Sequence, residues 1–141
     1  VGTGAAAEHA VAHIPRVPPL SVLLGVAGGG ALGSLLRFAV GRLLPAAPTG
    51  LPWSTLGINV LGSLALGMLA GASFARPDAS PALRAFLGVG LLGGFTTFST
   101  FSVETITLAQ TSSVARAAVY VALSVALAIG AAAVGFSLTR P

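Results

Sequence analysis

Residues 93–104 read GGFTTFSTFSVE, and they lie inside a long apolar stretch of the chain. These twelve residues hold two glycines, five serine or threonine hydroxyls and three phenylalanines, whereas a plain membrane helix would carry leucine, isoleucine and alanine. Adjacent glycines weaken a helix, and hydroxyls can pair with backbone groups that an interruption exposes. The segment therefore predicts a helix that is broken around residues 93–97. The alternative from composition alone is a small-residue seam for close helix packing.

The spacing of the side chains predicts what a helix resuming at Thr97 would display. Phe98 and Phe101 are three residues apart and would share one face. Thr97, Thr100 and Glu104 would gather on an adjoining stripe. One side of this helix would then present aromatic ring edges next to hydroxyl groups, at or near membrane depth.

The composition is that of a membrane protein. Of the 141 residues, 55% are hydrophobic and 7% charged, and the mean hydropathy is +0.95. The net charge of +4 comes from seven arginines scattered singly, so no basic run or stripe favours nucleic acid. The absence of cysteine excludes disulfides and thiolate metal sites.

The apolar segments predict an all-α membrane protein with four transmembrane helices, preceded by a flexible N-terminal arm at residues 1–20. We expect the spans at about residues 21–44, 53–74, 82–110 and 114–138, within one transmembrane domain at 21–140. The arm contains His9 and His13, but three prolines follow and no third ligand is near, so a metal site is not expected there. We also expect no enzyme, because the spans lack histidine and cysteine and Glu104 has no second carboxylate to pair with.

The first span carries a glycine stripe. Gly25, Gly29, Gly33 and Gly41 recur at intervals of four or eight residues, so they lie along one helix face and let another backbone come close. Arg37 continues this stripe. Its guanidinium could snorkel to the nearer interface, or it could be a buried or vestibule cation that holds helices together or attracts an anion.

The second span begins at Trp53, where an interfacial aromatic residue belongs. Thr55, Asn59 and Ser63 then recur every four residues on one face. An asparagine within a span is costly unless its amide finds partners. Asn59 could form an interhelical hydrogen bond or donate to a passing anion.

Two further polar features lie in the third and fourth spans. Glu104 is the only acid within a predicted span, and it could carry a proton or pair with Arg116 or Arg42; we prefer the structural pairing. On the fourth span, Tyr120 and Ser124 are four residues apart and form a short polar stripe.

The string GGFTTFSTF resembles the third-helix signature of the Fluc (CrcB) family of bacterial fluoride channels. The segments GGGALGSLLRF at 28–38 and GINVLGS at 57–63 are similar to the first and second helices of that family. The resemblance covers roughly residues 20–140. The family typically carries a longer row of hydroxyls on its fourth helix, whereas this chain has Ala128 and Ala132 at the next positions of the Tyr120 stripe.

The resemblance implies a passive, fluoride-selective channel in the bacterial inner membrane, built as an antiparallel dual-topology homodimer with two ion paths. The expected fluoride pathway comprises amide and hydroxyl donors, two phenylalanines with their ring edges, and one arginine: Asn59, Thr97, Thr100, Tyr120, Ser124, Phe98, Phe101 and Arg37. The resemblance also implies one central structural Na⁺, held by backbone carbonyls of Gly93 and Thr96 from both subunits. The resemblance favours a pore role for Asn59.

Two rival functions stay open at this point. A small four-helix proton-coupled exporter needs a carboxylate near the membrane midplane, typically on the first helix, and the first span here has no acid. A non-transporting membrane assembly subunit would use the polar stripes only for packing. The predicted loops divide the arginines only weakly between the two sides, which is compatible with insertion in both orientations.

Overall fold

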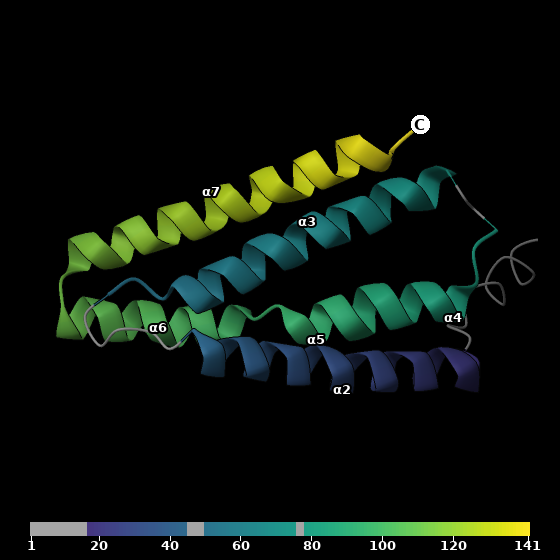
Figure 1. Cartoon of the computed structure of the whole chain (residues 1–141), viewed down its shortest axis with the longest axis horizontal. Helices are drawn as coiled ribbons and strands as arrows, with labels where there is room; N and C mark the ends of the chain where they lie inside the picture. Colours follow the sequence, from purple (N-terminus) through teal and green to yellow (C-terminus); the bar gives the residue numbers. More distant parts are fainter. Residues whose placement is uncertain (1–16, 45–49, 76–77) are drawn as a thin grey trace, which may run out of the picture.

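A computed structural model of the protein describes residues 17–44, 50–75 and 78–141. Within these ranges the regular structure is helical (Figure 1). The elements are α2 (Leu20–Leu43), α3 (Trp53–Ala75), α4 (Pro81–Arg84), the π-helical segment η1 (Ala85–Leu92), α5 (Gly93–Phe95), α6 (Phe98–Thr111) and α7 (Val114–Thr139). Residues 1–16, which include His9 and His13, lie outside the described part of the chain.

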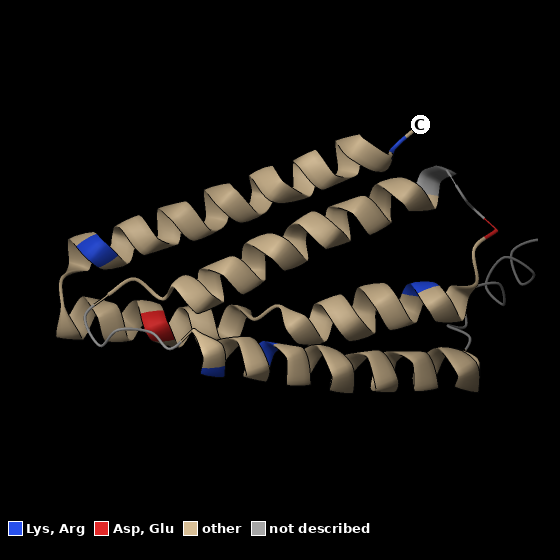
Figure 2. Ribbon diagram, viewed as in Figure 1, with Lys and Arg blue, Asp and Glu red and all other residues tan. Residues whose placement is uncertain are grey.

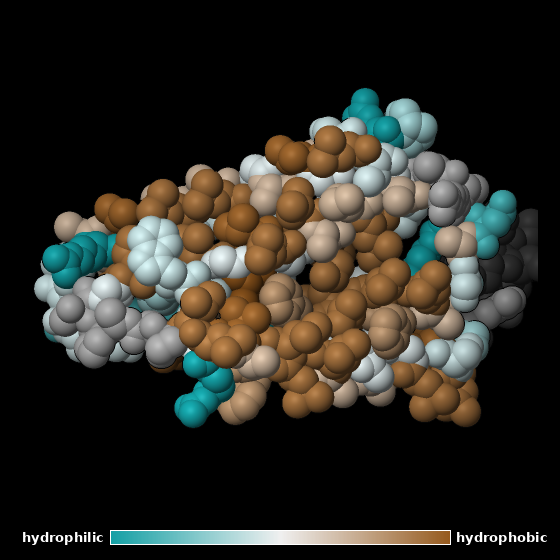
Figure 3. Space-filling model, viewed as in Figure 1, coloured by the Kyte–Doolittle hydropathy of each residue, from teal (hydrophilic) through white to brown (hydrophobic). Residues whose placement is uncertain are grey.

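Four helical stretches are long and apolar enough to cross a membrane: α2, α3, the composite stretch Pro81–Thr111, and α7. This confirms the predicted all-helical class with four transmembrane spans, and the chain is a multi-pass membrane protein. On the face shown in Figure 3, apolar side chains cover the middle and hydrophilic ones gather toward the ends. Large exposed side chains such as Leu35 and Phe38 belong to this apolar surface, as expected for contact with lipid.

The glycine stripe of α2 packs directly against the third helical stretch, and the two run side by side in Figure 1. A Cβ atom at Gly29 would lie 2.8 Å from the Leu91 nitrogen, and one at Gly33 would lie 2.8 Å from the Phe95 nitrogen. Only glycine permits backbones to approach this closely. The expectation of close packing is confirmed for Gly29 and Gly33, whereas a Cβ at Gly41 would meet nothing within 4 Å among the described residues.

A second glycine seam joins α3 to α7. A Cβ at Gly135 would lie 2.9 Å from the Met68 nitrogen, and one at Gly67 would lie 2.9 Å from the Ala132 carbonyl carbon. The Thr139 hydroxyl donates to the Met68 carbonyl oxygen at 2.8 Å. The described helices thus form two tightly joined pairs, α2 with the third stretch and α3 with α7.

The third stretch leaves helical conformation at two threonines. Gly93 has φ −65° and ψ −37°, which is helical, whereas Thr96 has φ −76° and ψ 158° and Thr97 has φ −151° and ψ 117°. The non-helical residues are therefore the β-branched threonines, for which extended backbone is favourable, and not the glycines. Gly94 instead allows close approach to α2, because its Cβ would lie 2.7 Å from the Gly30 oxygen.

Substitution in the first glycine seam tests this packing. We expect Gly33→Ala to lower the stability of the purified protein by about 1–3 kcal/mol, because the added methyl group must push two backbones apart. Gly41→Ala is the matched control on the same helix, where the methyl group meets no described atom within 4 Å. Thermal unfolding in detergent measures both. Equal stability of the two variants would contradict the packing.

Candidate functional site

Asn59 of α3 pairs with the backbone of Thr97. Its Nδ2 donates to the Thr97 carbonyl oxygen at 3.0 Å, and its Oδ1 accepts from the Thr97 N–H at 2.8 Å. An extended residue within a span has no helical partner for these groups, and lipid offers none. The side-chain amide supplies both the donor and the acceptor that are needed. Asn59 therefore holds α3 to the non-helical residues, which is the interhelical alternative of the sequence analysis.

Thr97 also begins α6. Its Oγ1 accepts from the Thr100 N–H at 3.2 Å and so caps the helix. The same hydroxyl donates to Thr100 Oγ1 at 3.0 Å and lies 3.3 Å from Ser99 Oγ. The hydroxyls of Thr97 and Thr100 are thus adjacent, as the predicted stripe requires, and they bond each other.

Arg37 reaches the other extended residue. Its Nη1 donates to the Thr96 carbonyl oxygen at 3.4 Å, a long hydrogen bond from α2 to the third stretch. The Thr96 hydroxyl and N–H both donate to the Leu92 oxygen, at 2.9 and 3.0 Å. Arg37 is half-buried. Of the alternatives considered for it, this contact supports a cation that holds helices together.

A cavity of about 210 Å³ lies beside the start of α6. Its lining combines one amide, two aromatic rings, one hydroxyl and three aliphatic side chains: Asn59, Phe98, Phe101, Ser124, Val125, Ala128 and Ile129. The rings of Phe98 and Phe101 are 5.4 Å apart between centroids and inclined by 46°. Phe101 is only 8% exposed, whereas Phe98 is 77% exposed. Phe101 therefore packs between the helices, and Phe98 lies on the exposed side of the cavity.

Ser124 adds a polar atom to this lining that the chain itself does not satisfy. Its Oγ is buried and has no hydrogen-bond partner among the described residues. Leaving a buried hydroxyl without a hydrogen-bond partner costs about 1–3 kcal/mol of folding stability relative to a paired one. The lining thus includes a residue whose hydroxyl no described residue satisfies.

The sequence analysis favoured Arg116 or Arg42 as the partner of Glu104, but among the described residues two hydroxyl groups bond this carboxylate. Its Oε1 accepts from the Thr55 hydroxyl at 2.8 Å and its Oε2 accepts from the Tyr120 hydroxyl at 2.8 Å. The expectation of an arginine partner is wrong because α6 turns this carboxylate toward α3 and α7. These two helices supply hydroxyl groups at the same depth.

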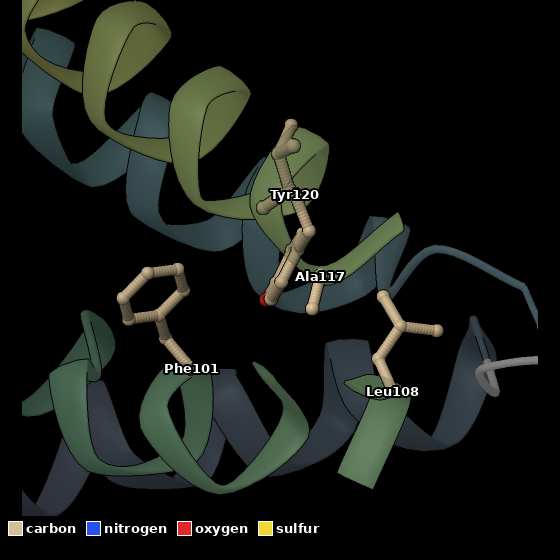
Figure 4. Packing of buried hydrophobic residues seen from close by; sticks show 5 residues of the cluster. Phe101, Leu108, Ala117 and Tyr120 are labelled. Atoms are coloured by element: carbon tan, nitrogen blue, oxygen red, sulfur yellow. The ribbon is translucent and has the colours of Figure 1, made fainter. Parts of the chain in front are cut away.

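The Tyr120 ring, whose hydroxyl belongs to the carboxylate cluster of Glu104, Thr55 and Tyr120, is completely buried. It stacks against Phe101 with centroids 5.3 Å apart and an interplanar angle of 48°. Figure 4 shows the Tyr120 ring reaching from α7 toward α6, beside Ala117 and between Phe101 and Leu108. Tyr120 therefore connects the carboxylate cluster to the aromatic wall of the cavity.

Comparison with known proteins identifies the family. The sequence profile described as "CrcB-like protein, Camphor Resistance (CrcB)" matches residues 24–136, which is most of the chain. The chain belongs to the CrcB family. This confirms the resemblance noted in the sequence, and membership in a family whose curated members are named as ion channels confirms that this CrcB protein is not an enzyme.

Curated relatives carry the name "Fluoride-specific ion channel FluC". One from Erythrobacter litoralis is 47% identical over 130 residues, covering 88% of this chain and 96% of the relative. One from Novosphingobium aromaticivorans is 48% identical over 118 residues, covering 82% and 93%. A third, "Fluoride-specific ion channel FluC 2" from Nocardia farcinica, is 41% identical and covers 89% and 91%.

The cavity of this CrcB protein gathers four of the eight predicted pathway residues: Asn59, Phe98, Phe101 and Ser124. The other four, Arg37, Thr97, Thr100 and Tyr120, are not in its lining. Sequence reasoning did not include Val125 and Ile129. The signal for them was helical spacing, because positions one, four and five residues after Ser124 form with it two adjacent stripes of α7, each with a spacing of four residues. The third such residue, Ala128, lies where the family typically places a hydroxyl.

The pairing between Asn59 and Thr97 predicts a cost for its removal in this CrcB protein. Asn59→Ala leaves the Thr97 N–H and carbonyl without their partners, so we expect a loss of about 1–3 kcal/mol per stranded group. Ser63→Ala, one helical turn later on the same face, is the control and should be nearly neutral. The midpoint of thermal unfolding in detergent measures the difference. A neutral Asn59→Ala would show that the pairing does not support the fold.

Proposed function

We propose that this CrcB-family protein is a passive fluoride channel of the bacterial inner membrane. The observation that carries the proposal is the cavity beside the start of α6, which is lined by two aromatic rings, an amide and a hydroxyl that has no partner among the described residues. None of the residues that line it is acidic or basic. Relatives at 41–48% identity that are named as fluoride-specific channels support the choice of ion.

The chemistry of the lining suits a small anion. Fluoride is strongly hydrated and accepts strong hydrogen bonds, so a path for it must replace water with donors. The amide of Asn59 donates one Nδ2 hydrogen to Thr97 and keeps a second, and the Ser124 hydroxyl has no partner among the described residues. Aromatic edges carry the positive part of the ring quadrupole, so Phe98 and Phe101 can face an anion edge-on.

The residues outside the lining have supporting roles in this proposal. Thr97 and Thr100 hold the start of α6, and Tyr120 supports Phe101 from behind. When the hydrogen bond between the Thr97 and Thr100 hydroxyls opens, these two groups can donate to fluoride at the end of the path. Arg37 adds positive charge near the non-helical residues, and this charge attracts anions toward the cavity.

We further propose an antiparallel homodimer with two pores and with residues 96–97 at mid-membrane depth. Phe98 is 77% exposed in the single chain, so one wall of the cavity lacks a cover. A second copy would complete that wall, and twofold symmetry would create two equivalent paths. The weak division of arginines between the two ends suits insertion in both orientations.

The carbonyl groups next to the non-helical residues fit a Na⁺ ion. The N–H that would normally bond the Gly93 carbonyl in an α-helix is that of Thr97, and it donates to Asn59 instead. Within the described ranges the Thr96 carbonyl accepts one bond, a long one from Arg37. Carbonyl oxygens of unwound helices are Na⁺ ligands in other membrane proteins. Gly93 and Thr96 of two subunits would hold the ion, which would stabilise the dimer and offset anion desolvation electrostatically.

Replacing both rings tests the fluoride path. We expect Phe98→Ile with Phe101→Ile to slow fluoride efflux from liposomes about tenfold, equivalent to about 1.4 kcal/mol, because both ring edges that would face the anion are lost. Phe38→Ile, on an exposed face of α2 outside the cavity, is the control and should keep wild-type efflux.

Three outcomes would count against the channel. Unchanged efflux in the double variant would remove the role of the rings. Wild-type efflux that requires a proton gradient would favour a proton-coupled exporter. Absence of halide flux from the purified wild-type protein would favour a non-transporting assembly subunit.

Gly93→Val tests the dimer and the cation. Within one chain a Cβ at Gly93 would meet only the Gly88 oxygen, at an ordinary 3.6 Å, so the subunit has room for it. We expect this variant to lose both the dimer and bound Na⁺, as read by size-exclusion chromatography with light scattering and by sodium analysis of the purified protein. Gly41→Val is the control. A stable wild-type dimer without any bound cation would contradict the Na⁺ site.

A further inference from the structure

A second hollow lies at the end of the molecule where α3 and α7 begin. Its volume is about 530 Å³, and it is lined by Gly50, Leu51, Trp53, Ala115, Arg116 and Val119. It shares no lining residue with the cavity beside α6. We propose that this groove binds an anionic phospholipid, with the phosphate on Arg116 and an acyl chain along the apolar walls.

The walls of the groove suit a hydrocarbon chain. Ala115 and Val119 are four residues apart and form one face of the first turns of α7. Leu51 and the large ring of Trp53 form the opposite wall at the start of α3. The volume falls within the range of about 300–1,000 Å³ that is usual for small-ligand sites. The groove can therefore hold part of a lipid tail in continuous apolar contact.

The charge at the groove suits a phosphate. Arg116 lies in the first turn of α7, the blue position at that end of the helix in Figure 2. Its Nη1 donates to Ser112 Oγ at 2.8 Å, which fixes the direction of the guanidinium. A guanidinium has five N–H donors in a planar fork that matches phosphate oxygens. No acidic residue is among the described residues that line the groove.

The position of the groove selects a lipid over a soluble anion. It lies at the ends of two helices that are long and apolar enough to span a membrane, where headgroups would meet the hydrocarbon. Trp53 is 63% exposed there, and tryptophan favours this interface. Basic pockets between transmembrane helices bind anionic headgroups in this setting. An acyl chain adds apolar burial that a free phosphate cannot supply.

The sequence provides its own probe, because Trp53 is the only tryptophan in the chain and lines the groove. Bromine atoms on acyl chains quench tryptophan fluorescence on contact. We expect brominated phosphatidylglycerol to quench Trp53 at a lower mole fraction than brominated phosphatidylcholine, in the full-length protein reconstituted in mixed bilayers. The preference should be about fivefold, the usual effect of one basic residue near an anionic surface.

Three variants separate the groove from general surface charge. Arg116→Gln should abolish the preference for phosphatidylglycerol. Arg42→Gln removes an exposed arginine from the last turn of α2, outside the groove, and should retain it. Ala115→Phe fills the groove while keeping Arg116, and should weaken quenching by both lipids.

Each remaining outcome would overturn the proposal. Equal quenching of the wild type by the two lipids would show that no anionic lipid is selected. An equal loss of preference in Arg42→Gln and Arg116→Gln would reduce the effect to surface charge. No quenching by either lipid would show that another copy of the chain covers Trp53. None of these readouts depends on fluoride transport, so the lipid site and the channel can fail separately.

Discussion

The hydrogen bonds between Asn59 and Thr97 are the interaction on which the site depends. A span cannot leave helical conformation in lipid unless every exposed N–H and carbonyl finds a partner. The amide of Asn59 pairs with both backbone groups of Thr97 in a single contact. Because this contact satisfies the N–H and the carbonyl of Thr97, the helix can be interrupted there and α6 can begin after it. Its first turns then carry Phe98 and Phe101 to the edge of a cavity.

The glycine seams give this arrangement a rigid frame. Along α2 and along the contact of α3 with α7, backbones approach without intervening side chains. Packing of this kind fixes helix positions closely, because few rotamers can adjust to a displacement. Between the two pairs, α6 contacts α7 through Phe101 and Tyr120, and Glu104 bonds hydroxyls from α3 and α7. The bonds of Glu104 thus join the two pairs inside a membrane-spanning stretch, where a carboxylate requires partners.

Local patterns in the sequence predicted the parts of the fold that depend on one helix at a time. The four spans follow from apolar length, the face shared by Phe98 and Phe101 from helical spacing, and the α2 contact from the intervals between glycines. Features that depend on a neighbouring helix were not predicted from the sequence. The departure from helical conformation falls on Thr96 and Thr97 because Asn59 is opposite them. The π-helical segment had no separate signal in the residues 85–92.

The cavity was predictable only in part for the same reason. Its polar and aromatic members follow from their residue types, but Val125 and Ile129 look like ordinary lipid-facing residues until α7 is placed beside α6. The partners of Glu104 required the same knowledge. The homodimer, the paired pores and the Na⁺ ion stay predictions, because they concern a second subunit and an ion.

The polarity of the third span has a consequence for how the chain enters the membrane during synthesis. This stretch is the least apolar of the four, since it carries Glu104 and more serine and threonine hydroxyls than any other span. Its partners α2 and α3 precede it and so leave the ribosome first. The glycine surface and the Asn59 amide are therefore already in the bilayer when the third span arrives. The third span therefore inserts together with helices that were made earlier. The most apolar span, α7, inserts last and packs against α3 and α6.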